Sequence, residues 1–536
     1  PDFIKMRLRE LVLENPHRVT LVVAPDAKLD QQRKERETAR LQAMRADLDQ
    51  PAIDNIRKLA QDLEDRQNQV DDVSILPKVG LADIPKDVVT PVLTHINVDE
   101  YTQHFVGTAG TNGLVYQQIA LKLPALTSAQ QERLPLLCAL ATEVGIGDTT
   151  YLEIQDRQSA SVGSLSLSVS TRASRSDVND ISGFLVMSSK ALAHKGSDQT
   201  RLMTDTLTAA SFVEGDRIRE LVKQIRARRD QSISGAGHSL AMTAACASMS
   251  PLANLYHTQS GLEGIARLRR LDDSLADTSS LRSLSEELTA LRTHLLTASS
   301  LNLLTVSDSQ NCEASTDQLR SAAHGLTSAG NLQPWSLSES VVGTNQIWAA
   351  NTQVNFCARA YPTVSSGHPD APILSVLAAY LRNGFLHRSI REQGGAYGGG
   401  ASHDGNVGAF RFFSYRDPRN LETLADFDAS IAWVLSAEPD SLALEEAILS
   451  VISSLDKPAS PSGEVKKAFY DGLYGRTADH KRALRESIVS TTLEDLRRVA
   501  NTYLNPEFGC SVILTDPKTA ASPALVDLGW THHDLA

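Results

Sequence analysis

Residues Ile390–Tyr415 read IREQGGAYGGGASHDGNVGAFRFFSY and predict a helix end, a glycine-rich turn and a strand, in that order. Five of the residues from Gly394 to Gly400 are glycine, so the backbone there can take positive φ angles and can approach a ligand closely. The flanking predicted elements are strands at Gln353–Ala360 and Gly408–Tyr415 and a helix that begins at Asp370 and runs through Leu377, Leu381 and Phe385.

The same order of elements is predicted earlier in the chain. Its members are a strand at Gly113–Leu123, an amphipathic helix at Ser128–Val144 capped by Ser128, a helix at Thr149–Gln158 and an alternating strand at Ser164–Ser170. A single offset along the chain superposes Tyr151 on His387, Ile154 on Ile390 and Gly163 on Gly399. The recurring order predicts a mixed α+β fold with two homologous α/β domains, at residues 76–325 and 326–536.

The first 75 residues have a different pattern. Residues 1–25 are predicted to be the tail of a preceding domain, because a helix at residues 3–14 and a strand at Arg18–Ala24 cannot form a core alone. Residues 26–75 are highly charged and predict a helical hairpin that links domains, with Pro51 in the first turn of its second helix. The narrow apolar seams of the two helices are Leu41, Met44 and Leu48, and Ile56, Leu59 and Leu63.

Composition excludes several classes of protein. A chain of 536 residues is too long for one core and is expected to form at least two domains. The net charge of -12 argues against nucleic-acid and anionic-membrane partners, and no apolar run approaches the ~20 residues of a membrane span. The five scattered cysteines form no Cys-x-x-Cys pair and predict free thiols in a reducing compartment. The start at Pro1, without a signal peptide, indicates a fragment or a processed piece.

Arg391 and Tyr397 flank the glycine-rich turn and are the candidate catalytic residues. The guanidinium is a permanent cation with a fork of donors, and the phenol is neutral at pH 7. Together they can hold a carbonyl oxygen or a carboxylate and stabilise negative charge that develops on it. On composition alone a second interpretation stays open, in which the glycines only form a tight turn and Arg391 pairs with a nearby acid.

Other polar motifs predict no site. No histidine is followed four residues later by another, so both His-Glu-x-x-His and His-x-x-Glu-His are absent and no metal ligand is assigned. Ser239 lies in GHSLA, half of a nucleophile elbow, but a charged helix precedes it. The glycines are followed by no Gly-Lys-Ser/Thr, which argues against a nucleotide site. We expect His532-His533 to be an exposed tail and His403-Asp404 to be a polar pair of a loop.

Longer motifs resemble one known family. IREQGGAYGGGA with the downstream FFSYRDP resembles the last domain of the presequence protease group of the pitrilysin-type metallopeptidases, the inverzincins. TNGLVYQQIALKLPAL, EVGIGDTTYLEIQDR and SISGAGHSLA resemble that family's third domain. ENPHRVTLVVAPD and the charged hairpin resemble its interdomain arm. The resemblance covers nearly the whole chain in order.

The resemblance implies four similar domains of the LuxS/MPP-like metallopeptidase type, two in each half of a clamshell joined by the hairpin. Residues 76–325 and 326–536 would then be the third and fourth domains. The family's zinc, on a His-x-x-Glu-His helix with a distal glutamate, is a cofactor of the full-length enzyme and lies in the other half. Zinc would polarise the scissile carbonyl, the glutamate would activate water, and an arginine and a tyrosine of the last domain would reach the substrate. Those last roles fall on Arg391 and Tyr397, with Gly394, Gly395 and Gly398 as substrate-binding positions.

The function implied is therefore half of an ATP-independent zinc endopeptidase that degrades unstructured, targeting-peptide-like oligopeptides in a closed chamber. The expected partners are such peptides and the missing N-terminal half, and the fragment alone is expected to be inactive. The alternative is a non-catalytic partner or structural subunit of the same superfamily. The expected location is the cytoplasm in a bacterium, or the mitochondrial matrix or another organelle otherwise.

Overall fold

The computed structural model describes two units, Pro1–Val79 and Gly80–Ala536, which are considered separately. Its described residues are 2–24, 26, 28–68, 75, 77–85, 90–297, 300–326, 333, 335–337, 343–436 and 440–536. Within these ranges, each helix is too short or too polar to serve as a transmembrane span. The predicted division at residues 25, 75 and 325 stays a prediction, and part of its last boundary region lies outside the described residues.

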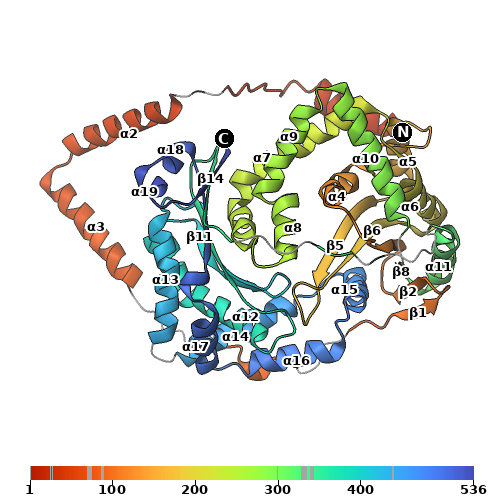
Figure 1. The fold of residues 1–536 in the computed structure, drawn as a ribbon. Helices are drawn as coiled ribbons and strands as arrows, with labels where there is room; N and C mark the ends of the chain where they lie inside the picture. Colours follow the sequence, from red (N-terminus) through yellow and green to blue (C-terminus); the bar gives the residue numbers. More distant parts are fainter. Residues whose placement is uncertain are drawn as a thin grey trace. The chain divides into compact units, whose positions relative to one another are not determined.

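The first unit is helical, as predicted. Its elements are α1 (Asp2–Leu8), a π-helical turn η1 (Arg9–Leu13), α2 (Leu29–Ala46) and α3 (Gln50–Asn68), drawn in red and orange in Figure 1. Pro51 occupies the first turn of α3, where the Asp49 carboxylate accepts the Ala52 N–H at 2.9 Å. The apolar seams of α2 and α3 stay exposed except at Leu48, so they are not buried against each other.

The predicted strand at Arg18–Ala24 is wrong. These residues have no strand pairing, and Val19, Leu21 and Val23 are more than 80% exposed. A strand exists only where a second strand accepts and donates its backbone hydrogen bonds. No such partner is present among the described residues of this unit, so the β-branched run is extended without being a strand.

The second unit contains two six-stranded sheets. The first has the order β1-β2-β8-β3-β6-β5. Its strands are β1 (Thr94–Asn97), β2 (Thr102–Thr108), β3 (Leu114–Lys122), β5 (Ser164–Ala173), β6 (Ile181–Leu192) and β8 (Leu301–Ser307). Its helices are α4 (Ser128–Leu140), α5 (Tyr151–Ser161), α6 (Gly196–Ala209), α7 (Gly215–Cys246), α8 (Pro251–Ser260), α9 (Leu262–Ser274), α10 (Thr278–Leu295) and α11 (Ser309–Ala323). A small two-stranded sheet joins β4 (Gly145–Ile146) to β7 (Ala210–Ser211).

The second sheet has the order β11-β12-β10-β13-β9-β14. Its strands are β9 (Gln346–Ala350), β10 (Phe356–Pro362), β11 (Gly398–Asp404), β12 (Ala409–Tyr415), β13 (Cys510–Thr515) and β14 (Thr531–Leu535). Its helices are α12 (Asp370–Leu381), the π-helix η5 (Arg382–Gln393), α13 (Leu421–Ser436), α14 (Ser441–Leu455), α15 (Pro461–Leu473), α16 (Ala478–Val489), α17 (Leu493–Tyr503), α18 (Pro517–Ala520) and α19 (Pro523–Val526).

The two sheets repeat one topology, which confirms the predicted mixed α+β fold. The outer hairpin β5-β6 corresponds to β11-β12, and β3, β8 and β2 correspond to β10, β13 and β9. The pairings agree, because β3-β8 and β10-β13 are antiparallel while β2-β8 and β9-β13 are parallel. The sixth strand differs: β1 pairs antiparallel to β2, whereas β14 pairs parallel to β9.

Three local predictions need correction. The cap of α4 is Thr127 rather than Ser128, because the Thr127 hydroxyl accepts the Gln130 N–H and the Gln130 side chain accepts the Thr127 N–H. The strand expected at Gln353–Ala360 begins only at Phe356, after Asn355 has bonded to Asp417. His532 and His533 lie in β14, where sheet pairing and stacking of His533 on Trp348 at 4.1 Å replace the expected exposed tail.

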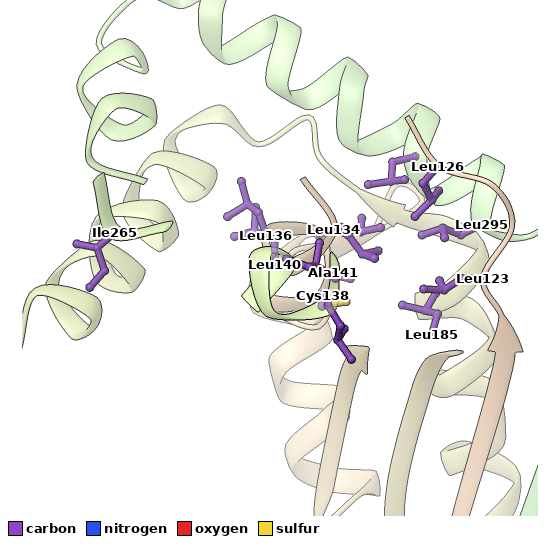
Figure 2. Close-up of a cluster of buried hydrophobic side chains, with 14 of the residues drawn as sticks. Leu123, Leu126, Leu134, Leu136, Cys138, Leu140, Ala141, Leu185, Ile265 and Leu295 are labelled. Carbon is purple, nitrogen blue, oxygen red and sulfur yellow. The ribbon is translucent and has the colours of Figure 1, made fainter. Parts of the chain in front are cut away.

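The first sheet is covered on one face by its own helices. Buried apolar residues of α4, α10 and the neighbouring strands form the centre of this core, and Figure 2 shows several of them. The residues labelled there are Leu123, Leu126, Leu134, Leu136, Cys138, Leu140, Ala141, Leu185, Ile265 and Leu295. All five cysteines of the chain are unpaired, and Cys138, Cys246 and Cys357 are buried.

Each half of the unit also lends a helix to the sheet of the other half. Helix α7, which follows the first sheet's strands, packs against β10, β12 and β13 of the second sheet. Helix α15 packs in return on the first sheet, where Figure 1 draws it beside the strands. Its Val465 and Phe469 are buried there, and the Phe469 ring meets the Phe105 ring at 5.4 Å. Burial of each such side chain stabilises the pairing by roughly 1.5–3 kcal/mol.

Gly237→Ala tests the packing of α7 on the second sheet. A Cβ at this position would lie 2.5 Å from Cδ2 of the fully buried Phe356 ring. We expect overpacking to lower the free energy of unfolding by about 1–3 kcal/mol in chemical denaturation. Gly235→Ala is the control on the same helix, because a Cβ there meets nothing within 4 Å. Equal stability of the two variants would contradict the packing described here.

Candidate functional site

The glycine-rich turn joins the end of η5 to the start of β11. The Gly395 N–H donates to the Arg391 carbonyl at 3.1 Å, and the Ala396 N–H donates to the Ile390 carbonyl at 3.1 Å. This Schellman-type ending needs a left-handed residue, and Gly395 has φ +79°. The positive φ expected of the glycines therefore occurs at Gly395.

Gly394 and Gly399 allow close approach rather than unusual dihedral angles. A Cβ on Gly394 would lie 2.6 Å from the Ile390 carbonyl oxygen, and one on Gly399 would lie 2.8 Å from Cγ2 of Ile390. A Cβ on Gly398, in contrast, would meet nothing within 4 Å. The first two glycines thus let the turn close over η5, while Gly398 leaves open space.

Tyr397 projects from this turn with 68% of its surface exposed. Its backbone N–H donates to the Tyr415 carbonyl at 3.0 Å, next to the first pair of the β11-β12 ladder, Gly398 opposite Tyr415. Its ring meets the Tyr415 ring edge-on at 5.6 Å. The phenol makes no hydrogen bond to a described residue, so its donor is available.

Arg391 lies in the last turn of η5 and is exposed. Its guanidinium forms no hydrogen bond or ion pair with any described residue. The acid partner of the second interpretation is therefore not found among the residues that the structure describes. Two free donor groups, one cationic and one neutral, leave a single helix-turn-strand connection.

Tyr397 rests on a row of rings that crosses between the two halves of the unit. Tyr415 contacts Tyr397 on one side and the His238 ring of α7 at 4.8 Å on another. His238 also meets the Phe413 ring at 5.6 Å. Burial lowers the pKa of His238, which favours the neutral imidazole. Sequence reasoning missed Tyr415 and His238, although both lie in motifs that carried the resemblance.

The RDPR segment after β12 holds the turn in place. The Arg419 guanidinium donates to the Ser389 carbonyl of η5 at 3.3 Å and pairs with Asp426 at 2.8 Å. The buried Asp417 carboxylate accepts the Thr423 hydroxyl at 2.7 Å and the Arg419 N–H at 2.9 Å. Desolvation nevertheless raises the pKa of Asp417. These bonds fix the path of the chain behind Tyr397.

The remaining sequence motifs are structural. Ser239 lies within α7, so no strand-turn-helix elbow surrounds it. His403 and Asp404 lie in β11 rather than in the loop expected for them, with His403 opposite Phe410 and Asp404 paired with Arg411 at 3.2 Å. Burial lowers the pKa of His403 to about 4. Within the described ranges no three His, Cys, Asp or Glu side chains gather as a metal-binding group, so these residues do not fit a zinc site.

Comparisons with known proteins agree with this architecture. Residues 23–271 match the associated domain of peptidase family M16, subfamily C, and residues 345–514 match "PreP C-terminal domain". A mitochondrial presequence protease of Danio rerio is 27% identical over 97% of this chain and 52% of its own length. One of Saccharomyces cerevisiae is 28% identical over 89% of this chain and 48% of its own length. The chain thus spans about half the length of these curated relatives.

A solved structure shares the fold at low identity. The structure described as a peptidase M16 inactive domain from Pseudomonas fluorescens superposes with a TM-score of 0.56 at 14% identity. The superposition covers 79% of this chain and 98% of that one. At this identity the likeness concerns the fold, and it agrees with two sheet-containing domains of the M16 type.

Gly394→Ala tests the close approach at the turn. Because the Ile390 carbonyl oxygen would lie 2.6 Å from the new Cβ, the end of η5 must shift. We expect a loss of about 1–3 kcal/mol in the free energy of unfolding and faster hydrogen exchange at the Ala396 amide. Gly398→Ala is the matched control, since its Cβ meets nothing within 4 Å. The prediction fails if Gly394→Ala exchanges and unfolds as the control does.

Proposed function

Because this chain is related to the C-terminal half of the presequence proteases of peptidase family M16, subfamily C, we propose that it is the zinc-free half of an ATP-independent metalloendopeptidase. The proposed substrates are unstructured, targeting-peptide-like oligopeptides. The observation that carries the proposal is the pair of free donors, Arg391 and Tyr397, on one braced turn. Its place of action would be the bacterial cytoplasm, or the mitochondrial matrix or another organelle, as the names of the relatives suggest.

Arg391 and Tyr397 would bind the carbonyl oxygen of the substrate at the bond to be cut. Charge grows on that oxygen in the transition state, so a cationic fork and a phenolic O–H bind it more strongly there than in the ground state. The hydrogen-bonded helix end and the Tyr415 ring position the donors before substrate arrives. Gly394, Gly395 and Gly398 would let a peptide backbone pass close to this turn. Metal chemistry would be supplied by the other half.

The alternative is a non-catalytic partner or structural subunit of the superfamily. A scaffold gains nothing from leaving an arginine and a tyrosine unpaired beside a hydrogen-bonded glycine turn. The backbone bonds of the turn and the Tyr415 ring position both groups without occupying their donors. The free donors therefore favour the catalytic proposal.

Arg391→Ala and Tyr397→Phe test the proposed roles in the complete enzyme. We expect each change to lower kcat on the order of 10²-fold, because one transition-state donor is lost. Arg388→Ala is the control, since Arg388 is an exposed residue of the same helix. Steady-state kinetics on a fluorogenic peptide would measure the effect, and thermal melts would confirm folding. Wild-type turnover in both variants would remove the roles assigned here.

Activity of the isolated chain tests the division of labour. We expect the 536-residue chain to bind no stoichiometric zinc and to hydrolyse no peptide, because the described residues hold no metal-binding group. Joining it to the N-terminal half in one polypeptide should restore both. Elemental analysis and a fluorogenic peptide assay on the two proteins would decide. Zinc and turnover from the chain alone would overturn the proposal.

A further inference from the structure

A second cavity of the unit is independent of the turn that carries Arg391 and Tyr397. It has a volume of about 260 Å³ and is lined mainly by α14, α15 and α16, with Arg175 from the β5-β6 turn. The β5-β6 turn is held in place because the Arg175 carbonyl accepts the Gly367 N–H at 2.8 Å. Residues of both halves therefore form this cavity.

The cavity holds more positive charge than its own acids neutralise. Asp456 is occupied by an ion pair with Arg485, and Asp471 is paired with Lys481 at 2.5 Å. Glu464 uses one carboxylate oxygen to accept the Ala459 N–H at 2.7 Å. Arg175 and Arg476 line the same space, and neither side chain forms a hydrogen bond or ion pair with any described residue.

Arg476 is held in this position by the fold. It follows Gly475, whose φ of +64° turns the chain between α15 and α16, and its N–H donates to the Asp471 carbonyl at 2.7 Å. Burial, and then the charges of Arg172 and Arg175, lower the pKa of Arg476. A half-buried guanidinium beside other cations is stabilised when an anion joins it.

The rest of the wall is apolar. Pro91, Leu455 and Leu484 line the cavity together with Ala468. Arginine forks match the two oxygens of a carboxylate, whereas the apolar wall favours an aliphatic group over a fully hydrated ion.

We propose that this cavity binds an organic carboxylate that carries a small aliphatic group, with Arg175 and Arg476 on the carboxylate and Leu455 and Leu484 around the aliphatic part. Two sources share this chemistry: the free C-terminus of a peptide that ends in an aliphatic residue, and a free branched carboxylic acid. The inference does not depend on the proposed peptidase, since every residue in it belongs to this chain.

Calorimetric titration of the 536-residue chain tests the site. The probes are acetyl-Ala-Ala-Leu with a free carboxylate, the same peptide as its amide, 3-methylbutanoate and inorganic phosphate. We expect the amide to bind at least about tenfold more weakly than the free acid, since a charge-assisted bidentate pair is lost. Comparable binding of the peptide acid and 3-methylbutanoate would assign the site to free acids, and tighter binding of the peptide would assign it to peptide termini.

Arginine variants link the binding to the cavity. Arg175→Gln and Arg476→Gln should each weaken the free acid at least about tenfold, with Arg476→Lys, which keeps the charge, weakened less. Arg482→Gln is the control, because Arg482 is an exposed residue of α16 that pairs with Asp479 at 2.9 Å and does not line the cavity. Thermal melts would show that the variants fold. The assignment is overturned if no probe binds, if the amide or phosphate binds as well as the acid, or if folded Gln variants bind unchanged.

Discussion

The exchange of helices between the two sheets is the constraint on which the rest of the larger unit depends. Each sheet has one face covered by helices of its own half and another covered by a helix from the other half, α7 on the second sheet and α15 on the first. Removing either helix would expose a face of large apolar side chains to water. The two repeats therefore cannot separate without loss of core, although their topologies are those of independent domains.

That constraint places the glycine turn. Helix α7 sets Gly237 against Phe356 and His238 against Tyr415, and Tyr415 in turn supports Tyr397. The turn is thus braced by its own helix end and by a ring from the other half. Its donors can stay free because backbone hydrogen bonds and ring contacts already hold the turn. The cavity at Arg476 follows the same logic, since the α15-α16 corner that carries Arg476 is anchored by α15 on the first sheet.

Local signals in the sequence predicted much of this. Glycine spacing predicted the left-handed residue at Gly395, and alternation predicted β5 and β12, because both depend on neighbours in the chain. Pairing over long distances was out of reach. Arg18–Ala24 has strand composition but no partner among the described residues, and His532-His533 has tail composition but pairs with β9. The contact of His238 with Tyr415, and the shared cavity of Arg175 and Arg476, likewise exist only after the halves have interlocked.

The late position of α15 in the chain also matters while the polypeptide is being made. The strands of the first sheet are complete once Ser307 has left the ribosome, yet the helix that covers Val186, Leu304 and Val306 begins only at Pro461. During the interval this apolar face has no cover from its own sequence. Nascent chains are then prone to aggregate or to recruit chaperones, because uncovered apolar sheet surface associates readily.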